Sequence, residues 1–317
     1  MSVLKVGSYD LEANLNAMSD NVKDIAARRA AELIRWFDSH RQNVIAFSGG
    51  VDSTVVLAAS IASGARTVAV TAKSPSVARW QLDLANTVAS ELGAEHRVIE
   101  TDEVNRSEYR VNDSSRCFHC KSTLYAGIRA ALEFGGDDVT VLSGTNADDL
   151  GDYRPGIQAG RNADVKTPLA DLGIDKPMVR AIAKHFGLSN ADLPASPCLA
   201  SRIAYGVEVT PERLAKIESA ESFLRERRLE DLRVRLHQSE LARIEVPLHQ
   251  VAAITAEPLR SELVSAFRAA GFEYITLDLE GFSSGSMNRP LVSLHSRLLD
   301  SPHKQVVPSA LEPHHEG

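Results

Sequence analysis

The residues with the clearest chemistry lie at positions 46–53, which read Ala-Phe-Ser-Gly-Gly-Val-Asp-Ser. A buried strand is expected before this loop, at 43–47, and a helix after it, at 53–63. Two glycines let the backbone approach a ligand, while hydroxyl groups and the N–H groups of a helix start favour a bound anion. A carboxylate beside a phosphate requires a divalent cation between them, so Asp52 adds Mg²⁺ to a predicted nucleotide site.

The loop is not a Walker A motif, because the Gly-Lys-Ser/Thr ending is missing. It resembles instead the PP-loop, Ser-Gly-Gly-x-Asp-Ser, of ATP pyrophosphatases. That resemblance implies cleavage of ATP between its α- and β-phosphates, pyrophosphate held by the loop, and transfer of AMP to an acceptor oxygen. The alternative is a glycine-rich turn that only joins a strand to a helix, and the presence of every fixed position of the motif argues against it.

Three cysteines are the second chemical feature. Cys117 and Cys120 form a Cys-x-x-Cys pair, and Cys198 follows far along the chain. A redox pair would stand in a thioredoxin-like unit, which the surroundings do not match. A zinc site wants four ligands, and His119 is poorly placed between two of them. Three thiolates could instead hold three irons of a [4Fe–4S] cluster and leave the fourth iron open for a sulfide.

Cys198 lies between Pro197 and Arg202 in a polar segment. A nearby guanidinium favours the thiolate, which is the reactive form of cysteine. The alternative is a buried apolar residue, a common state of a free cysteine. The flanking proline, serine and arginine favour a polar loop, so we predict a reactive Cys198 assisted by Arg202.

Further polar residues follow other predicted strands. The segment 143–149, Ser-Gly-Thr-Asn-Ala-Asp-Asp, comes after the strand at 139–143 and is expected at the same sheet edge as the phosphate loop. The nucleotide contacts predicted at this edge are Thr71, Gly144 and Asn146. The carboxylates that could hold Mg²⁺ or orient the acceptor are those of Asp148, Asp149 and Asp152. A solvated loop with capping side chains is the alternative.

Charged residues also mark two other elements. Lys176 and Arg180, at i and i+4 on a predicted helix, form a cationic edge that could meet phosphates or simply face solvent. Strands at 232–237 and 241–246 alternate apolar and charged residues, which predicts one apolar and one cationic face. An anionic ligand would relieve the repulsion on that face, although an ordinary solvated face is the alternative. The residues predicted to contact substrate there are Arg233, Arg235, Arg243 and Glu245.

The elements that position these groups alternate along the chain, which predicts an α/β domain with a parallel sheet and helices on both faces. An amphipathic helix at 21–38 precedes them. The remaining strands are expected at 67–71 and 95–100, and the other helices at 76–92, 120–134 and 176–186. After about residue 200 the pattern changes to that of a smaller α+β domain, with a helix from Thr210 to Arg228, a second at 258–270 and a strand at 273–279. We therefore divide the chain into a nucleotide domain at 1–200, a second domain at 201–290 and a tail at 291–317.

Composition limits the class of protein. No apolar run approaches the ~20 residues of a membrane span, and the first residues lack a secretory signal. The net charge of −7 argues against binding nucleic acid by electrostatics alone. Three cysteines in 317 residues are too few for a disulfide scaffold and are typical of a reducing cytoplasm.

Together these motifs resemble the LarE-type ATP-dependent sulfur transferases, over roughly residues 20–290. The matching segments are 48–53, 116–121, 144–149, 197–202, 233–237, 242–245 and 285–288. The family acts in making the nickel-pincer nucleotide cofactor of lactate racemase. The resemblance implies that a carboxylate of pyridinium-3,5-dicarboxylate mononucleotide is adenylylated and that sulfur then displaces AMP to give a thiocarboxylate. It also implies a homo-oligomer, with trimers paired as hexamers.

The resemblance assigns roles to single residues. Cys198 matches the sulfur-donating cysteine, which in the sacrificial form attacks the acyl-adenylate and is left as dehydroalanine. The additional Cys117 and Cys120 match the variant with a [4Fe–4S] cluster and repeated sulfide delivery, which we favour here. Pyrophosphate would be held by Ser48, Gly49, Gly50 and Ser53, Mg²⁺ by Asp52 and Asp149, and the substrate's phosphate or carboxylate by Arg233 and Arg235.

Three rival interpretations stay open. A tRNA thiolase also joins a PP-loop to three cluster cysteines, but the acidic net charge counts against an RNA surface. An amide-forming PP-loop ligase would leave the cysteines unexplained. A nucleotide-binding regulator would bind ATP without releasing pyrophosphate.

Overall fold

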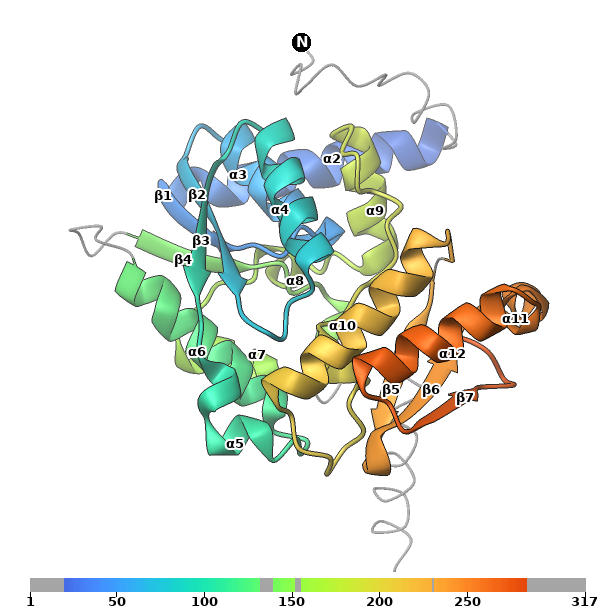
Figure 1. The fold of residues 1–317 in the computed structure, drawn as a ribbon. Helices are drawn as coiled ribbons and strands as arrows, with labels where there is room; N and C mark the ends of the chain where they lie inside the picture. Colours follow the sequence, from blue (N-terminus) through green and yellow to red (C-terminus); the bar gives the residue numbers. More distant parts are fainter. Residues whose placement is uncertain (1–19, 132–138, 152–154, 230, 284–317) are drawn as a thin grey trace, which may run out of the picture. The chain divides into compact units, whose positions relative to one another are not determined.

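The computed structural model describes residues 20–131, 139–151, 155–229 and 231–283 (Figure 1). The predictions for Asp152, the motif at 285–288 and the tail at 291–317 fall outside these residues. The described residues up to Phe282 belong to one compact unit. The domain boundary near residue 200 stays a prediction.

Four parallel strands form the first sheet, in the order β3-β2-β1-β4. They are β1 (Gln42–Ala46), β2 (Arg66–Lys73), β3 (Glu95–Glu100) and β4 (Val139–Ser143). Ala46 at the end of β1 pairs with Val70 on one side and with Ser143, the end of β4, on the other. The segments that follow β1 and β4 therefore leave the sheet side by side, where ligands of such sheets bind.

Helices cover both faces of this sheet, as the alternating pattern predicts (Figure 1). One apolar core joins the sheet to α2 (Asp20–Trp36), α3 (Val51–Ala62), α4 (Arg79–Glu91) and α9 (Lys176–His185). A second core joins the other face to α6 (Arg116–Ala131), on which α7 (Pro155–Asn162) packs. Helix α3 is apolar on nearly every side because it is buried from its first turn to its last. The class predicted from the sequence is confirmed.

A smaller sheet follows, in the order β5-β6-β7, with an antiparallel and then a parallel pair. Its strands are β5 (Arg233–His237), β6 (Leu241–Glu245) and β7 (Tyr274–Leu277), and its helices include α10 (Pro211–Glu226) and α12 (Leu259–Ala270). Thr210 caps α10 by accepting from the N–H of Arg213, and Gly271 ends α12 with a φ of +95°. Ala78, Val104 and Tyr109 from earlier in the chain share this sheet's core.

Two helix starts differ from the prediction. Helix α6 begins at Arg116 rather than near residue 120, because Asp113 accepts from the N–H of Ser115 (2.7 Å) and organises the preceding turn. The Cys-x-x-Cys pair therefore lies at the start of α6, with Cys117 in its first turn and Cys120 at the beginning of its second. Helix α4 begins at Arg79 rather than near residue 76, because a turn held by the Ser74 carbonyl precedes it.

Several short elements were not predicted, since one or two turns leave little periodicity to detect. They include α5 (Ser107–Arg110), α8 (Pro168–Asp171) and α11 (Val251–Thr255). Among the helices that the structure describes, none has both the length and the apolar character needed to cross a membrane.

Candidate active site

The loop between β1 and α3 presents the groups expected of a phosphate-binding site. Gly50 is the N-cap of α3 and no side chain caps the helix, so N–H groups of its first turn are available to an anion. The Ser53 hydroxyl donates to the carbonyl of Gly50 (3.0 Å), and the Ser48 hydroxyl lies 3.3 Å from that of Ser53. The two predicted phosphate hydroxyls are therefore neighbours.

Two glycines allow this loop to pack backbone against backbone. Gly49 has a φ of +71°, and a Cβ added to it would lie 2.9 Å from the Cα of Ala85 in α4. A Cβ added to Gly144, just after β4, would lie 2.5 Å from the backbone nitrogen of Ser53. Any larger residue at either position would push the loop away from its supports.

Asp52 in the first turn of α3 connects three predicted site residues. Its Oδ1 accepts from the side-chain amide of Asn146 (3.0 Å), and Asp149 Oδ2 accepts from the backbone N–H of the same asparagine (3.1 Å). Lys176 at the start of α9 places its ammonium 2.5 Å from Asp52 Oδ2. Arg180, one turn further, is not part of this group, because it donates to the carbonyls of loop residues after α9.

A magnesium ion fits this arrangement. Mg²⁺ is typically bound by one or two protein carboxylates, with phosphate oxygens and waters completing its six ligands. Asp52 and Asp149, held on either side of Asn146 next to the phosphate loop, provide such a pair. In the described ranges no larger group of three or more histidine, cysteine or carboxylate side chains could hold a metal.

Thr71 near the end of β2 touches the phosphate loop but uses its hydroxyl structurally. The hydroxyl donates to the carbonyl of Phe47 (2.9 Å), and its oxygen lies 2.8 Å from Nε2 of His96. Burial lowers the pKa of His96, which favours a neutral ring. Because the threonine proton goes to Phe47, Nε2 must be the protonated nitrogen. A nucleotide contact by Thr71 stays a prediction.

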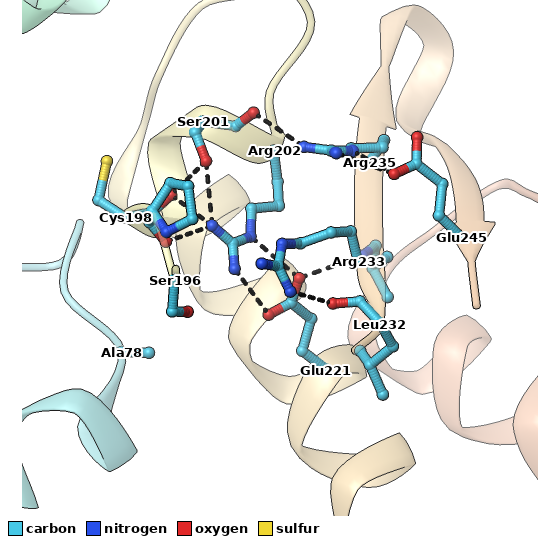
Figure 2. A network of polar contacts seen from close by, with 12 residues as sticks. Ala78, Ser196, Cys198, Ser201, Arg202, Glu221, Leu232, Arg233, Arg235 and Glu245 are labelled. Carbon is cyan, nitrogen blue, oxygen red and sulfur yellow. Dashed lines mark hydrogen bonds and ion pairs between the residues drawn. The ribbon is translucent and has the colours of Figure 1, made fainter. Parts of the chain in front are cut away.

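The loop that carries Cys198, residues 195–202, is called the sulfur loop below. It is held by Arg202 (Figure 2). The Arg202 side chain is 1% exposed and forms an ion pair with Glu221 of α10 (3.0 Å). It also donates to the carbonyls of Pro197 and Cys198. Figure 2 shows the Cys198 sulfur directed away from this guanidinium. Arg202 therefore positions the backbone of the sulfur loop, and its predicted effect on the thiol stays a prediction.

Two other cations lie near the thiols. Arg116 is buried and donates to the carbonyl of Ala200 (2.8 Å), two residues after Cys198. Burial acts to lower the pKa of Arg116, but the charges of Cys198 and Cys117 raise it, and the net shift is upward. The pKa of Lys121 is raised by Tyr125 against the effect of burial, and all three cysteines add to the rise. We missed both cations, although they flank the Cys-x-x-Cys pair in the sequence.

The three thiols are within electrostatic reach of one another but do not form a ligand set. Burial raises the pKa of Cys120 to about 12, and the charges of Cys198 and Glu103 add to this rise. Cys120 is therefore a protonated thiol at neutral pH. No group of three metal-binding side chains is found among the described residues. The predicted [4Fe–4S] cluster is not supported by this arrangement.

The charged face of the β5–β6 pair is buried at Arg233, Arg235 and Glu245 and partly exposed at Arg243. Arg235 stands directly opposite Arg243, which would be destabilising without a counter-charge. Glu245, whose side chain is 0% exposed, lies 2.8 Å from Arg235 and 3.2 Å from Arg243, and Asp278 also pairs with Arg243. The carboxylates of Glu245 and Asp278 thus offset the repulsion between the two arginines without a bound anion. Contact with substrate by these residues stays a prediction.

The strand arginines also reach the sulfur loop (Figure 2). Arg233 donates to the carbonyl of Ala195 (3.1 Å), and Arg235 to that of Ser201 (3.3 Å). Burial, with the charge of Arg202 next, lowers the pKa of Arg233 to about 10, so it is still a cation at neutral pH. The guanidinium groups outnumber the carboxylates here, which makes the region attractive to an anionic group.

Helix α4 connects the phosphate loop to the sulfur loop. Gly49 packs against Ala85, while the Gln81 side chain donates to the carbonyl of Ser196 (2.8 Å), two residues before Cys198. Positions 81 and 85 are about one helical turn apart, or about 6 Å along the axis. The two predicted reactive loops therefore dock on one face of one helix.

A cavity of about 360 Å³ opens beside the end of β4, a volume suited to a small ligand. Ser143 and Thr145, on either side of Gly144, belong to its wall. The other lining residues are Tyr125, Leu150, Gly156, Ile157, Gly160, Arg161, Val165, Thr167, Ala170 and Asp171.

The parallel sheet, the glycine loop at the start of α3 and the aspartate in its first turn define an enzyme of the PP-loop ATP pyrophosphatase superfamily. A family model described as queuosine biosynthesis protein QueC matches residues 42–118. The chain is 32% identical over 267 residues to the pyridinium-3,5-bisthiocarboxylic acid mononucleotide synthase of Lactiplantibacillus plantarum, covering 84% of this chain and 95% of the relative. It therefore belongs to the LarE family.

Other relatives and one solved structure are also similar. An uncharacterized protein of Synechocystis sp. is 42% identical over 261 residues, covering 82% of this chain and 96% of the relative. An uncharacterized protein of Methanocaldococcus jannaschii is 31% identical over 245 residues, covering 77% and 92%. The solved structure of NMN synthetase from Francisella tularensis superposes with a TM-score of 0.43 at 20% identity, covering 54% of this chain and 75% of that one.

Proposed function

We propose that the chain is an ATP-dependent sulfur transferase that converts a carboxylate of pyridinium-3,5-dicarboxylate mononucleotide into a thiocarboxylate. The observation that carries this proposal is the docking of the phosphate loop and the Cys198 loop one turn apart on α4. The name of the Lactiplantibacillus plantarum relative, a bisthiocarboxylic acid mononucleotide synthase, supports this substrate class.

In the first half-reaction, an oxygen of the substrate carboxylate attacks the α-phosphorus of ATP and the bond to the β-phosphate breaks. The acyl-adenylate forms and pyrophosphate leaves with the electron pair. Ser48, Ser53 and the N–H groups at the start of α3 hold the departing pyrophosphate. Mg²⁺ bound by Asp52 and Asp149 would offset charge on the phosphates, and Lys176 brings a further positive charge to the same place.

In the second half-reaction, the thiolate of Cys198 attacks the activated acyl carbon and AMP leaves, which gives a thioester. Loss of the Cα proton of Cys198 and cleavage of its Cβ–S bond then yield dehydroalanine and the thiocarboxylate, whose sulfur keeps the bonding pair. Arg116, which donates to the carbonyl of Ala200, brings a positive charge close to the loop that carries this cysteine. Arg233 and Arg235 would hold the phosphate or second carboxylate of the substrate beside this loop.

The test is a single-turnover reaction of anaerobically purified protein with ATP, Mg²⁺ and the dicarboxylate nucleotide. We expect Cys198→Ala to release pyrophosphate and AMP but to form no thiocarboxylate. The wild-type peptide that contains residue 198 should lose the mass of H₂S. Thiocarboxylate formation by Cys198→Ala at the wild-type level would refute the proposal.

Cys120→Ala is the matched control, because it removes a neighbouring thiol from the same region. It should still form thiocarboxylate in a single turnover if Cys198 alone donates sulfur. Loss of product in this variant, with iron and acid-labile sulfide bound to the wild type and an intact Cys198 after turnover, would show that the three thiols deliver sulfur jointly through a cluster.

The proposal extends to the oligomeric state of the protein and its cellular compartment. The family resemblance favours a homo-oligomer built from trimers, which light scattering of the purified protein would check. All three cysteines are free thiols, which favours a reducing cytoplasm.

A further inference from the structure

Asn190, in the turn after α9, holds the phosphate loop from behind. Its side chain is buried at 1% exposure. The side-chain nitrogen donates to the carbonyl of Gly49 (2.8 Å) and to the hydroxyl oxygen of Thr54 (2.8 Å). A carbonyl oxygen only accepts hydrogen bonds, so the atom that faces Gly49 must be the NH₂ group and the amide has one possible orientation.

These contacts determine the direction of two successive peptide groups. In a trans peptide the C=O and the following N–H point in opposite directions. Holding the Gly49 carbonyl on Asn190 therefore turns the N–H of Gly50 to the opposite side, where it donates to the Ser48 hydroxyl of the phosphate loop (3.3 Å). The Thr54 hydroxyl, which accepts from Asn190, donates in turn to the Gly50 carbonyl (2.9 Å) and so directs the N–H of Val51.

We propose that Asn190 is a positioning residue for ATP binding, which aims the Gly50 and Val51 N–H groups of the phosphate loop at the nucleotide. The site at Gly49 needs this support, because its left-handed φ of +71° is a conformation that glycine leaves readily. The inference deepens the proposed function, since it rests on the loop between β1 and α3 being the ATP site.

The position of Asn190 in the chain gives this contact a second consequence. The same segment continues for eight residues to Cys198, and on the way the carbonyl of Ser196 accepts from Gln81 of α4. The phosphate loop is thus tied to the segment that carries the reactive sulfur.

Asn43 in β1 is a closely matched control. It is also buried, at 2% exposure, and its side-chain nitrogen also donates to one carbonyl, that of His40 (2.9 Å), and to one hydroxyl of α3, that of Ser60 (2.9 Å). The Oδ1 atoms of both asparagines are buried with no hydrogen-bond partner in the described part of the chain. Asn43 supports the far end of α3, away from the phosphate loop. The two residues therefore differ mainly in their partners, which are in the phosphate loop for Asn190 and at the other end of α3 for Asn43.

The experiment compares Asn190→Asp with Asn43→Asp in the full-length protein. Each change keeps the side-chain shape and replaces a donor by an acceptor, so both should lower the melting temperature by similar amounts. Binding of α,β-methylene-ATP with Mg²⁺, measured by calorimetry, needs no acceptor substrate because the bond that is cut in ATP is blocked. We expect Asn190→Asp to bind this analogue at least tenfold more weakly than wild type, and Asn43→Asp to stay within twofold.

An acid titration adds a readout that loss of stability would not produce. A protonated carboxylic acid carries one O–H donor, and burial raises its pKa. Relative to wild type at each pH, Asn190→Asp should regain affinity as the pH falls, while Asn190→Leu should not. If Asn190→Asp does not fold, Thr54→Val removes only the hydroxyl relay and should weaken binding several-fold.

The outcomes separate this inference from the proposed function. Equal binding by the variants at positions 190 and 43, or wild-type binding by Thr54→Val, overturns the role of Asn190 and leaves the proposed function standing. A wild-type protein that does not bind the ATP analogue overturns both.

Discussion

Replacing Gly144 by alanine tests the arrangement of the nucleotide site most directly. The new Cβ would lie 2.5 Å from the backbone nitrogen of Ser53 and 2.8 Å from the carbonyl carbon of Asp52. Atoms of this kind prefer about 3.5 Å, so β4 and the start of α3 must separate by about 1 Å. Both contacts are to backbone, which cannot rotate away. Overpacking of this kind costs ~1–3 kcal/mol of stability, and a displacement of about 1 Å at a site costs roughly 100-fold in rate.

The assays are urea denaturation and pyrophosphate release in the presence of the acceptor. Gly127→Ala, in α6, is the control for the same chemical change. Its Cβ would meet Cδ1 of Ile99 at 3.2 Å, the far end of a side chain that can rotate. Because alanine is favoured over glycine in a helix by ~1 kcal/mol, this variant should match the wild type within about 1 kcal/mol and in rate. Wild-type stability and pyrophosphate release by Gly144→Ala would refute the proposed contact between β4 and the phosphate loop.

Three further predictions concern charges. Burial, with Arg243 next, lowers the pKa of His237 below its ordinary 6.5, and Glu221 has a lowered pKa because neighbouring arginines outweigh its burial. Both groups bind fewer protons in the folded than in the unfolded chain. The free energy of unfolding should therefore be highest near pH 8, decrease below about pH 6.5 and decrease again below about pH 4.5. A flat profile from pH 8 to 4 would contradict this. Glu245→Gln should cost ~3–5 kcal/mol in urea denaturation, because it leaves two opposed arginines without their buried counter-charge, and a loss below 1 kcal/mol would contradict that role. Lys176→Met should slow pyrophosphate release at least tenfold with little change in melting temperature, because this partly exposed side chain acts through Asp52; an unchanged rate would exclude this role.

The sheet could be predicted because its strands and helices have strong and separate periodicities. Each of β1 to β4 lies within two residues of its expected bounds, since short runs with β-branched residues alternate with longer helical stretches. The start of α6 was placed too late, because the polar residues Arg116 to Lys121 do not resemble a buried helix. They form the segment that carries Cys117 and Cys120, where chemistry rather than packing selects the residue types.

The site was predictable where a motif is continuous and not where it is assembled from distant segments. The loop at 46–53 and the residues after β4 meet as expected, because parallel strands end at one edge. Glu221 gave no signal, since a glutamate on an amphipathic helix is usually solvated, and here it is buried beneath Arg202. Asn190 gave none either, because its partner Gly49 lies far away in the sequence.

The two half-reactions of the proposed function require that a reactive acyl-adenylate be intercepted before water reaches it, which demands a constant spacing between the phosphate loop and the sulfur. Three contacts join the phosphate loop, helix α4 and the segment 190–198 into a closed ring. Gly49 packs on Ala85 of α4, Gln81 of the same helix holds Ser196, and Asn190 at the other end of that segment returns to Gly49. A loop held by one contact can move about it, whereas the parts of this ring can separate only if one of the three contacts breaks. The spacing between the phosphate loop and the Cys198 loop is therefore set by helix α4 and by the contact of Asn190 with Gly49.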